Sequence, residues 1–149
     1  MAAHYRMMEE RDRNGVIGMM RVFYASDAVS TNGSEEIFER DFSACVGDCP
    51  FVEGYVFIRD NETVGYSMVS KTYSTECGRL TLWLEDLYIR DGFRGEGIGG
   101  GFIAFLEDKY PKRLIRLEVE KENLRALKVY RKHGFTEISY LEMIKHAFD

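Results

Sequence analysis

Residues 93–102, FRGEGIGGGF, place five glycines within seven positions, between a strand-like run and a helix-like run. Glycine weakens regular secondary structure, so this density indicates that bare backbone is needed there. Gly95, Gly97 and Gly100 satisfy the dinucleotide-binding pattern G-x-G-x-x-G, but three glycines alone are a weak signal. The surrounding sequence has to decide what the turn binds.

Three kinds of phosphate-binding turn compete for these glycines. A P-loop is excluded because no Gly-Lys-Ser/Thr follows. A Rossmann turn starts at the end of its strand and is followed by several βα units, whereas here RDGFR intervenes and only about fifty residues remain. A glycine turn at a helix N-terminus fits better, because it presents free N–H groups and the helix dipole to a pyrophosphate, and Arg94 adds positive charge.

The strand-like run before the turn, RLTLWLEDLYI at residues 79–89, has an irregular apolar pattern. Leu80, Leu82 and Leu84 alternate, but the next apolar position in this pattern is Leu87, a step of three. One extra residue at Glu85–Asp86 is what a β-bulge produces, and bulges free backbone groups near active sites. A strand buried on both faces is the alternative, but two acids in its middle argue against it.

The whole chain reads as one α/β domain, residues 1–149, with a mixed, mostly antiparallel and bulged sheet flanked by about four helices. The predicted order is β-α-α-β-β-β-α-β-α-β. Ser34 is a predicted helix N-cap. The expected elements are strands at 4–10, 51–60, 63–74, 79–89, 113–120 and 135–148, and helices at 11–26, 32–47, 97–110 and 122–133.

Charge and cysteine content narrow the function classes. The net charge of −5 argues against a general nucleic-acid binder, although residues 90–133 hold 11 Lys/Arg against 7 Asp/Glu. No apolar run has the length of a membrane span, and no signal peptide is visible at the start. The three cysteines are expected to be reduced thiols of a cytoplasmic protein. Cys45 and Cys49 have helical spacing but no second ligand pair, so no metal site is predicted.

Two segments together resemble the GNAT superfamily of acetyl-CoA-dependent N-acetyltransferases. RGEGIG, residues 94–99, fits the family pattern R/Q-x-x-G-x-G/A after a bulged strand. RLEVEKENLRALKVYRKHGF, residues 116–135, looks like the later strand and helix of that fold. The resemblance covers residues 80–135 closely and implies acetyl-CoA as cofactor, but it says little about the acceptor.

The resemblance implies a set of cofactor-binding residues. The backbone at the end of the bulged strand pairs with the pantetheine arm, the glycine turn holds the pyrophosphate, and one stripe of the later helix faces the pantetheine and the sulfur. Arg125 is a further basic candidate for the remaining phosphate. The implied residues are Leu87, Tyr88, Ile89, Arg94, Gly95, Glu96, Gly97, Ile98, Gly99, Gly100, Asn123, Ala126 and Tyr130.

Two catalytic roles follow from the same resemblance. Tyr130 is the expected acid that protonates the departing thiolate. An ammonium acceptor must lose a proton before it attacks, and a carboxylate at the bulge can take that proton. We choose Glu85 as the base because several amine acetyltransferases of the family carry Glu there, while Asp86 and a water chain stay open.

The acceptor pocket of this fold is usually lined by the first helix, the loop after it and the central strands. Aromatic walls and acids suit a cationic amine, through charge and cation–π contact. The predicted acceptor residues are Phe23, Tyr24, Asp27, Tyr73 and Trp83.

The leading hypothesis is therefore an enzyme that moves an acetyl group from acetyl-CoA to a primary amine. The alternatives are an inactive CoA-binding sensor or interaction protein, a protein N-terminal acetyltransferase, and a nicotinamide-binding protein. The expected partners are a small-molecule amine and a second copy of the chain, with no nucleic acid and no membrane. Polyamines, amino acids, antibiotics, aryl amines and protein N-termini all stay open as acceptors.

Overall fold

The structure is a computed structural model that describes residues 2–148. Its elements follow the predicted order up to the last helix. They are β1 (His4–Met7), the 3₁₀ helix η1 (Glu10–Asp12), α1 (Arg13–Tyr24), α2 (Glu35–Val46), β2 (Val52–Arg59), β3 (Glu62–Ser74), β4 (Arg79–Ile89), α3 (Ile98–Lys109), β5 (Arg113–Leu117) and α4 (Leu124–Lys132).

The five strands form one mixed sheet in the order β1-β2-β3-β4-β5. Neighbouring strands are antiparallel except β4 and β5, which are parallel because α3 connects them across one face. The predicted fold class, a mixed and mostly antiparallel sheet flanked by helices, is confirmed.

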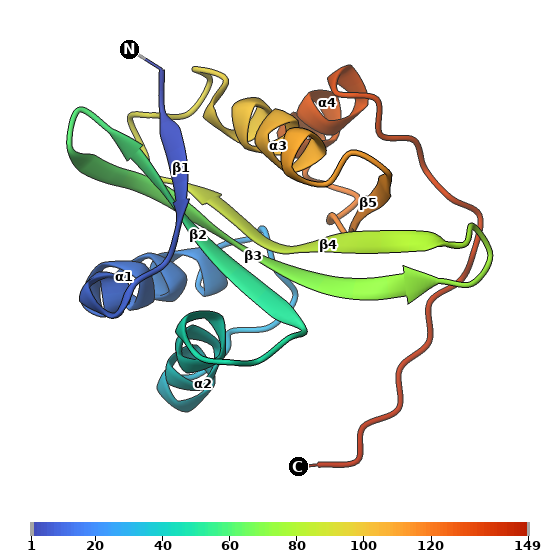
Figure 1. The fold of residues 1–149 in the computed structure, drawn as a ribbon, viewed down its shortest axis with the longest axis horizontal. Coiled ribbons are helices and arrows are strands. Elements are labelled where there is room, and N and C mark those ends of the chain that lie inside the picture. The colour runs from blue at the N-terminus through green and yellow to red at the C-terminus, as the bar shows by residue number, and fades with distance from the viewer. Residues whose placement is uncertain (1, 149) are drawn as a thin grey trace.

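The sheet separates two helical layers. Figure 1 shows α1 and α2 on one face, and α3 and α4 on the other. Each layer has its own buried cluster: Met19, Met20 and Phe42 are central to the α1/α2 side, and Phe102 and Leu106 to the α3 side. Both faces of the central strands are therefore buried, which explains the strongly apolar sequences of β2 and β3.

Local signals explain several boundaries. The Ser34 hydroxyl accepts a hydrogen bond from the Ile37 N–H at 3.2 Å, which confirms the predicted N-cap of α2. The β2–β3 hairpin turns at Asp60 and Asn61, whose φ angles are 52° and 63°. Asn and Asp adopt this left-handed conformation more readily than other non-glycine residues, so the chain turns here, one residue earlier than the gap at 61–62 between the two predicted strands.

The glycines around α3 serve two different purposes. Gly95 and Gly97 have φ angles of 80° and 81°, so the turn itself requires glycine. Gly100 and Gly101 lie inside α3, where an added Cβ would lie 2.3 Å from the His133 ring and 2.3 Å from the Tyr5 hydroxyl, respectively. The density of glycine therefore reflects close packing of α3 against β1 and α4 as well as the shape of the turn.

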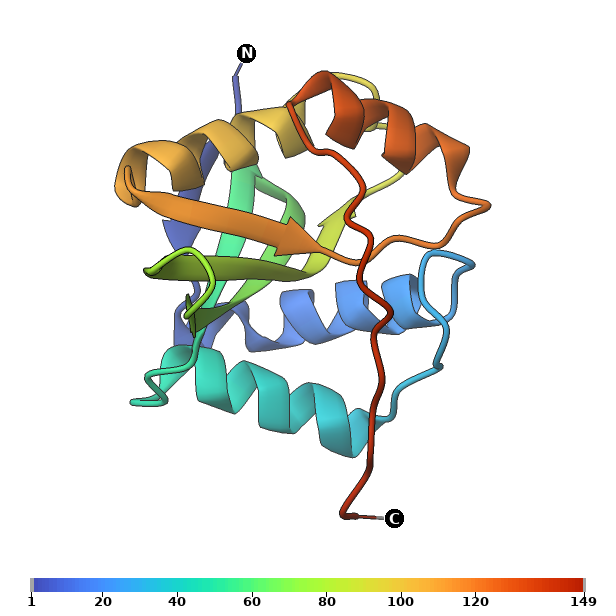
Figure 2. The same cartoon turned by 90° about the vertical axis from the view of Figure 1, so that its right-hand side faces the viewer.

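The C-terminal part of the chain differs from the prediction. β5 ends at Leu117 rather than at residue 120, and residues 135–148 form no strand, although their sequence is rich in β-formers. This stretch, which we call the C-terminal segment, runs as extended chain past the sheet and ends beyond α2 (Figure 2). The expected last strand is wrong because β-forming residues indicate only β-propensity, whereas a strand also needs a pairing partner. Within residues 2–148, no helix is long and apolar enough to cross a membrane.

The close approach at Gly101 predicts a specific loss of stability. Gly101→Ala should destabilise the protein by about 1–3 kcal/mol, because the methyl group would displace the Tyr5 hydroxyl, which donates to the Ile98 carbonyl at 2.7 Å. Gly99→Ala is the matched control, since its Cβ would meet Leu87 at an ordinary 3.8 Å. Urea unfolding of both variants measures the difference, and equal stabilities would contradict the packing role.

Candidate active site

The irregularity in β4 is a β-bulge at Glu85. Met68 of β3 lies opposite Asp86, while Val69 lies opposite Leu84, so Glu85 has no partner on β3. Because side chains alternate with a period of two, the extra residue places Glu85 and Asp86 in the lining of the same cavity. The predicted bulge is confirmed, and its effect is to turn two consecutive carboxylates toward the α1/α2 side.

The pairing of β4 with β5 stops just before the bulge. The parallel ladder runs from Leu80 opposite Arg113 to Leu84 opposite Leu117. Beyond it, residues 87–89 of β4 pair with β3 only, among the described strands. The two strands therefore part at the bulge, and one edge of the β4 backbone is left available there.

The glycine turn leads directly from this open edge into α3. Gly97 is the N-cap of α3, and the first bond of the helix joins the Gly101 N–H to the Gly97 carbonyl at 2.9 Å. The N–H groups of the first turn before Gly101 therefore have no acceptor within the helix. Arg125 of α4 brings its guanidinium beside the turn, 3.6 Å from where a Cβ of Gly95 would lie. Free N–H groups, a helix dipole and a guanidinium can together hold an anion.

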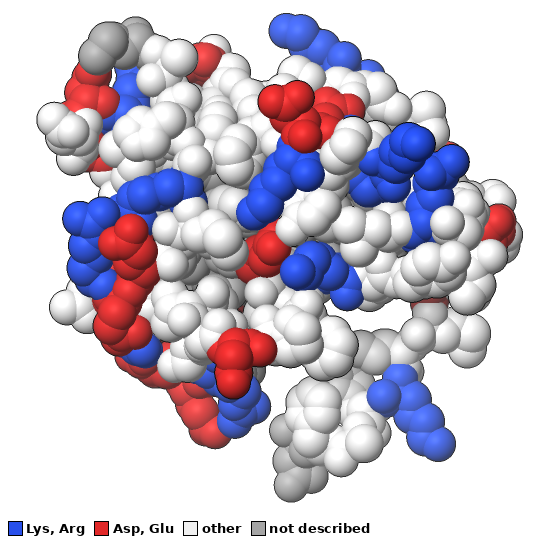
Figure 3. Space-filling view, viewed as in Figure 1, with Lys and Arg blue, Asp and Glu red and all other residues white. Residues whose placement is uncertain are grey.

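Two charged residues of the turn are already engaged elsewhere. Arg94 donates to the Ile89 carbonyl at 2.8 Å and pairs with Asp91 at 2.8 Å, so it ties the turn to the end of β4. Glu96 pairs with Arg59 of β2 at 2.7 Å. Figure 3 shows several Lys and Arg side chains on the part of the surface over α3, α4 and β5, with acidic side chains among them. This side of the molecule suits a polyanion.

A cavity of about 260 Å³ lies on the opposite side of the sheet, between α1, α2 and the bulge. We call it the acceptor cavity. Its lining contains three carboxylates and, among the described residues, no Lys or Arg. The lining residues are Tyr24, Asp41, Ala44, Val52, Met68, Glu85 and Asp86.

Asp86 is the most buried of these carboxylates, with 2 % of its surface exposed. It accepts hydrogen bonds from the Tyr24 and Tyr66 hydroxyls, both at 2.7 Å. Burial raises the pKa of Asp86 to about 6. The hydrogen bonds from the two tyrosines lower the pKa in part, and the nearby charges of Asp41 and Glu85 raise it slightly further. Burial likewise raises the pKa of Asp41. In both cases burial disfavours the charged form, for Asp41 against the opposing charge of Arg40, and a cationic ligand in the cavity would stabilise the carboxylates.

Glu85 differs from Asp86 in exposure. Its side chain is exposed, and its carboxylate accepts a hydrogen bond from the Ser70 hydroxyl. A carboxylate at the mouth of a cavity can exchange protons with solvent, whereas a buried carboxylate held by two tyrosines is suited to fixing a cation. The bulge thus gives two neighbouring acids different environments.

Two of the three residues predicted around α4, Asn123 and Tyr130, have structural partners of their own. The Asn123 side chain caps the helix by accepting from the Ala126 N–H at 3.2 Å. Tyr130 packs edge-on against Phe135, with 5.6 Å between ring centroids, and belongs to the cluster on the α3 side that also contains Leu87. Burial raises the pKa of Tyr130 to about 12, so the hydroxyl keeps its proton at neutral pH and can act as an acid.

The structure brings together only part of the predicted acceptor set. Tyr24 lines the acceptor cavity, and Phe23 packs on Tyr24 at 5.2 Å without lining it. Asp27 lies in the loop after α1, and Tyr73 is largely exposed. The Arg116 guanidinium lies over the Trp83 ring, 4.7 Å from its centroid, in a cation–π contact. The roles of these residues in acceptor binding stay predictions.

The sequence reasoning missed Asp41 and Tyr66 altogether. Asp41 lies next to the apolar stripe of α2 formed by Phe38 and Phe42, and an acid adjoining a buried stripe was the available signal. Tyr66 left no signal, because a tyrosine in an apolar strand reads as a core residue.

Comparison with known proteins identifies the family. A profile of the acetyltransferase (GNAT) family matches residues 19–135, so the chain belongs to this family. A bovine (Bos taurus) thialysine N-epsilon-acetyltransferase is 36 % identical over 83 residues, which are 53 % of this chain and 48 % of the relative. The chain thus spans about half the length of this curated relative.

Solved structures share the fold across nearly the whole chain. A possible acetyltransferase from Clostridium difficile 630 superposes with a TM-score of 0.82 at 18 % identity and covers 100 % of both chains. AAC(6')-Iy, in complex with the bisubstrate analogue CoA-S-monomethyl-acetylneamine, has a TM-score of 0.79 at 16 % identity, covering 99 % of this chain and 100 % of its own. At these identities the likeness shows the fold alone.

The environment of Asp86 predicts a pH dependence of stability. Its pKa is raised on folding, so the folded protein binds more protons than the unfolded chain between about pH 4 and about pH 6, and stability falls as pH rises through this window. Asp86→Asn has no carboxyl group to titrate. The free energy of unfolding of the wild type minus that of the variant should therefore increase when the pH is lowered from 7.5 to 4.5. Urea unfolding measures the difference at both pH values. Asp48→Asn, at an exposed site, should show little change, and a pH-independent Asp86→Asn difference would contradict the burial of charge.

Proposed function

We propose that the protein is an acetyl-CoA-dependent N-acetyltransferase that acetylates a primary amine of a small, cationic acceptor. The observation that carries this proposal is the bulge in β4, which opens a backbone edge beside the glycine turn and directs two carboxylates into the acceptor cavity. A phosphate-binding end and a cation-binding end thus lie on opposite faces of one strand. That arrangement fits a reaction between an anionic donor and a cationic acceptor.

The chain's own groups fit CoA at two points. The unpaired β4 edge at residues 87–89 can take the amide groups of a pantetheine arm as an added strand would. The free N–H groups at the start of α3, with Arg125 beside them, suit the pyrophosphate. When bound, acetyl-CoA supplies the activated acetyl thioester. AAC(6')-Iy, which shares this fold, has been solved in complex with CoA and with a CoA bisubstrate analogue, which supports the same assignment.

The residues divide the chemistry as follows. Asp86, held by Tyr24 and Tyr66, positions the ammonium of the acceptor, and Glu85 removes a proton from it. The free amine forms the new C–N bond as the C–S bond breaks, and Tyr130 gives its proton to the departing sulfur. A backbone N–H of β4 stabilises the negative charge that develops on the carbonyl oxygen. The proton taken by Glu85 returns to solvent. The nitrogen of the new C–N bond then loses its surplus proton, which passes through solvent to the Tyr130 oxygen, so the product is a neutral amide and Tyr130 is restored.

The charge of the acceptor cavity favours acceptors with more than one cationic group. The named substrates of similar proteins, thialysine and aminoglycosides, are amines of this kind and support the proposal. A release assay for free CoA over a panel of amines tests it, with diamines, basic amino acids and aminoglycosides set against a neutral aryl amine and a peptide N-terminus. We expect the cationic small molecules to be acetylated fastest. Binding of acetyl-CoA without turnover of any amine would instead indicate a CoA sensor, and preference for the peptide would indicate a protein N-terminal acetyltransferase.

The glycine turn gives a sharp test of cofactor binding. Gly97→Val should abolish acetyl-CoA binding, because a branched side chain at a φ of 81° distorts the turn that orients the free N–H groups. Gly92→Val is the matched control, because Gly92 has a φ of 89° and, like Gly97, no neighbouring atom within 4 Å of its added Cβ. Gly92 precedes the turn, so its replacement should leave the free N–H groups in place. Calorimetric titration of both folded variants measures the affinity. Tight binding by Gly97→Val would move the phosphate site elsewhere.

The proposed division between base and acid predicts two pH profiles. Glu85→Gln should lower kcat/KM by roughly 10²-fold at neutral pH, and the defect should shrink as pH rises, because free amine becomes available without a base. Tyr130→Phe should cause a loss of similar size that persists across the active range, because amine activation is intact. Kinetics against pH with the best amine measure both. A Glu85→Gln enzyme with wild-type activity at neutral pH would assign the base to Asp86 or to a water chain.

A further inference from the structure

The turn that leads from β4 into α3, residues 90–97, carries acidic as well as basic side chains. Arg90 and Arg94 are matched in number by Asp91 and Glu96, so the turn has no net charge of its own. At a protein surface a carboxylate repels a phosphate over several Å, because the Coulomb energy falls only slowly with distance. The turn therefore favours an anion only where the charges of its two acids are offset.

The two acids are offset in different ways. Asp91 pairs with Arg94 inside the turn at 2.8 Å, and its side chain is 89 % exposed, so water screens its charge. Glu96 has its partner outside the turn: its carboxylate accepts a hydrogen bond from Nη1 of Arg59, the last residue of β2, at 2.7 Å. The exposed fractions of these two side chains are 40 % for Glu96 and 20 % for Arg59. The Glu96 charge is therefore screened less by water and depends more on its arginine.

Arg59 contacts the turn at a second point. Its guanidinium lies 5.4 Å from the centroid of the Phe93 ring, in a cation–π contact. Phe93 in turn packs against the buried cluster on the α3 side. A planar guanidinium can stack on a ring and bind a carboxylate at the same time, which a flexible ammonium does less well. Arg59 thus fixes the Glu96 carboxylate on the side of the turn that faces β2.

The β2–β3 hairpin is a firm support for this contact. The Arg90 N–H donates to the Val64 carbonyl at 2.8 Å, and the Nε of Arg90 donates to the Thr63 carbonyl at 3.0 Å. The backbones also approach closely at Gly65, where an added Cβ would lie 2.4 Å from the Tyr88 carbonyl. The hairpin and the start of the turn therefore form one packed unit, and the arginine at the end of β2 acts from within it.

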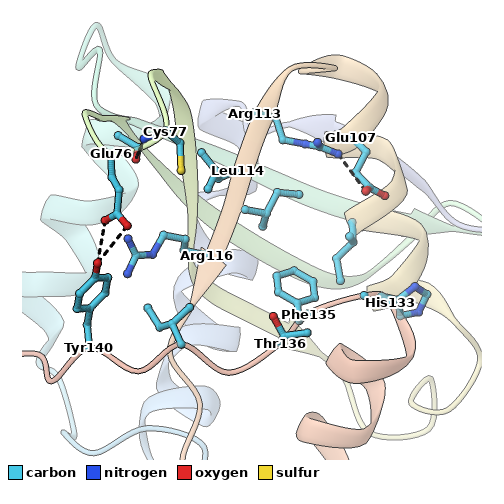
Figure 4. Close-up of a pocket in the computed structure, with 15 residues that line it drawn as sticks. Glu76, Cys77, Glu107, Arg113, Leu114, Arg116, His133, Phe135, Thr136 and Tyr140 are labelled. Carbon is cyan, nitrogen blue, oxygen red and sulfur yellow. Dashed lines mark hydrogen bonds and ion pairs between the residues drawn. The ribbon is translucent and has the colours of Figure 1, made fainter.

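A second arginine ties α3 to the sheet far from the turn. Arg113 of β5 pairs with Glu107, near the end of α3, at 3.0 Å, and Figure 4 shows this ion pair between the strand and the helix. In both ion pairs the arginine is mostly covered and the glutamate is exposed, but Glu107 does not belong to the turn. Arg113 therefore serves as an internal reference, which separates the fixing of α3 from the offsetting of charge at the turn.

We propose that Arg59 is a positioning residue for the cofactor. It holds the Glu96 carboxylate toward β2 and offsets its charge, so that the free N–H groups at the start of α3 take the pyrophosphate without repulsion. Because the anion is the pyrophosphate of acetyl-CoA, this role rests on the proposed function. It adds a residue of β2 that the glycine motif does not contain, and that residue acts through Glu96 without touching the ligand.

Removal of the Glu96 charge distinguishes this role from two others. If Arg59 bound a phosphate itself, or only tied the turn in place, the variant Arg59→Gln would stay impaired when Glu96→Gln is added. If Arg59 offsets the carboxylate, the second substitution removes the charge that repels the ligand and restores binding. The two substitutions therefore form a double-mutant cycle in which the affinity of the double variant decides.

Calorimetric titration of the full chain with acetyl-CoA at low ionic strength provides the measurement. We expect Arg59→Gln to raise the dissociation constant about 10-fold, and Glu96→Gln to lower it about threefold, since it removes a charge and keeps a hydrogen-bond acceptor for Arg59. The double variant should bind within about threefold of the wild type. Arg113→Gln is the matched control and should leave the dissociation constant unchanged. Circular dichroism checks the fold of each variant.

A donor without phosphates provides a second readout. S-acetylpantetheine carries an acetyl thioester on a pantetheine arm but no pyrophosphate, so the Glu96 carboxylate has no phosphate to repel. Arg59→Gln should therefore lower kcat/KM at least about five-fold more with acetyl-CoA than with S-acetylpantetheine, with the best amine as acceptor. Equal losses with both donors would overturn the proposal, as would a double variant that binds acetyl-CoA no better than Arg59→Gln.

The affinity of the wild type separates this role of Arg59 from the proposed function. A wild type with no affinity for acetyl-CoA would overturn both. Tight binding by the wild type and by Arg59→Gln alike would leave the proposed function standing and overturn the role of Arg59.

Discussion

The extra residue at Glu85 is the constraint on which the active site depends. Without it, strict alternation would direct Asp86 toward the α3 side, into an apolar cluster that holds no counter-charge. With it, Asp86 meets the hydroxyls of Tyr24 and Tyr66, and the Ser67 hydroxyl donates to the Asp86 carbonyl at 2.6 Å. These three bonds hold the irregular backbone in place. The same irregularity lies where β4 parts from β5. A single extra residue therefore shapes the acceptor cavity and also coincides with the start of the unpaired β4 edge at residues 87–89.

The sheet also organises the charge of the molecule. Residues 90–133, which form the α3/α4 side and β5, carry an excess of basic residues, whereas the rest of the chain is acidic. A low-dielectric sheet between the two regions limits screening. Under the proposed function, the anionic donor and the cationic acceptor would each be attracted to their own face, and their reactive groups would meet where β4 is open. The net charge of −5 therefore does not show that basic residues are in excess on one side of the sheet and acidic residues in the rest of the chain.

Sequence reasoning succeeded where the signal was local. The step from Leu84 to Leu87 gave the bulge, Ser34 gave the start of α2, and the motif RGEGIG gave the family. It failed where the cause was a contact between distant elements. The meeting of Asp41 on α2 with Asp86 on β4 depends on how the helix lies over the sheet. The strand expected in the C-terminal segment failed for the same reason, because β-forming residues alone cannot show whether a sheet edge will pair with them.

The glycine turn shows how one motif can answer two physical demands. Gly95 and Gly97 are set by backbone conformation, whereas Gly100 and Gly101 are set by the neighbouring Tyr5 and His133 side chains. Counting glycines therefore overstates the direct evidence for a ligand. Yet the packing glycines also serve the turn, because they fix the start of α3 against β1 and α4, and the free N–H groups of a helix bind an anion well only when the helix end is held rigidly. Under the proposed function, close packing of α3 would thus be part of the anion site, although the residues that cause it need not touch the ligand.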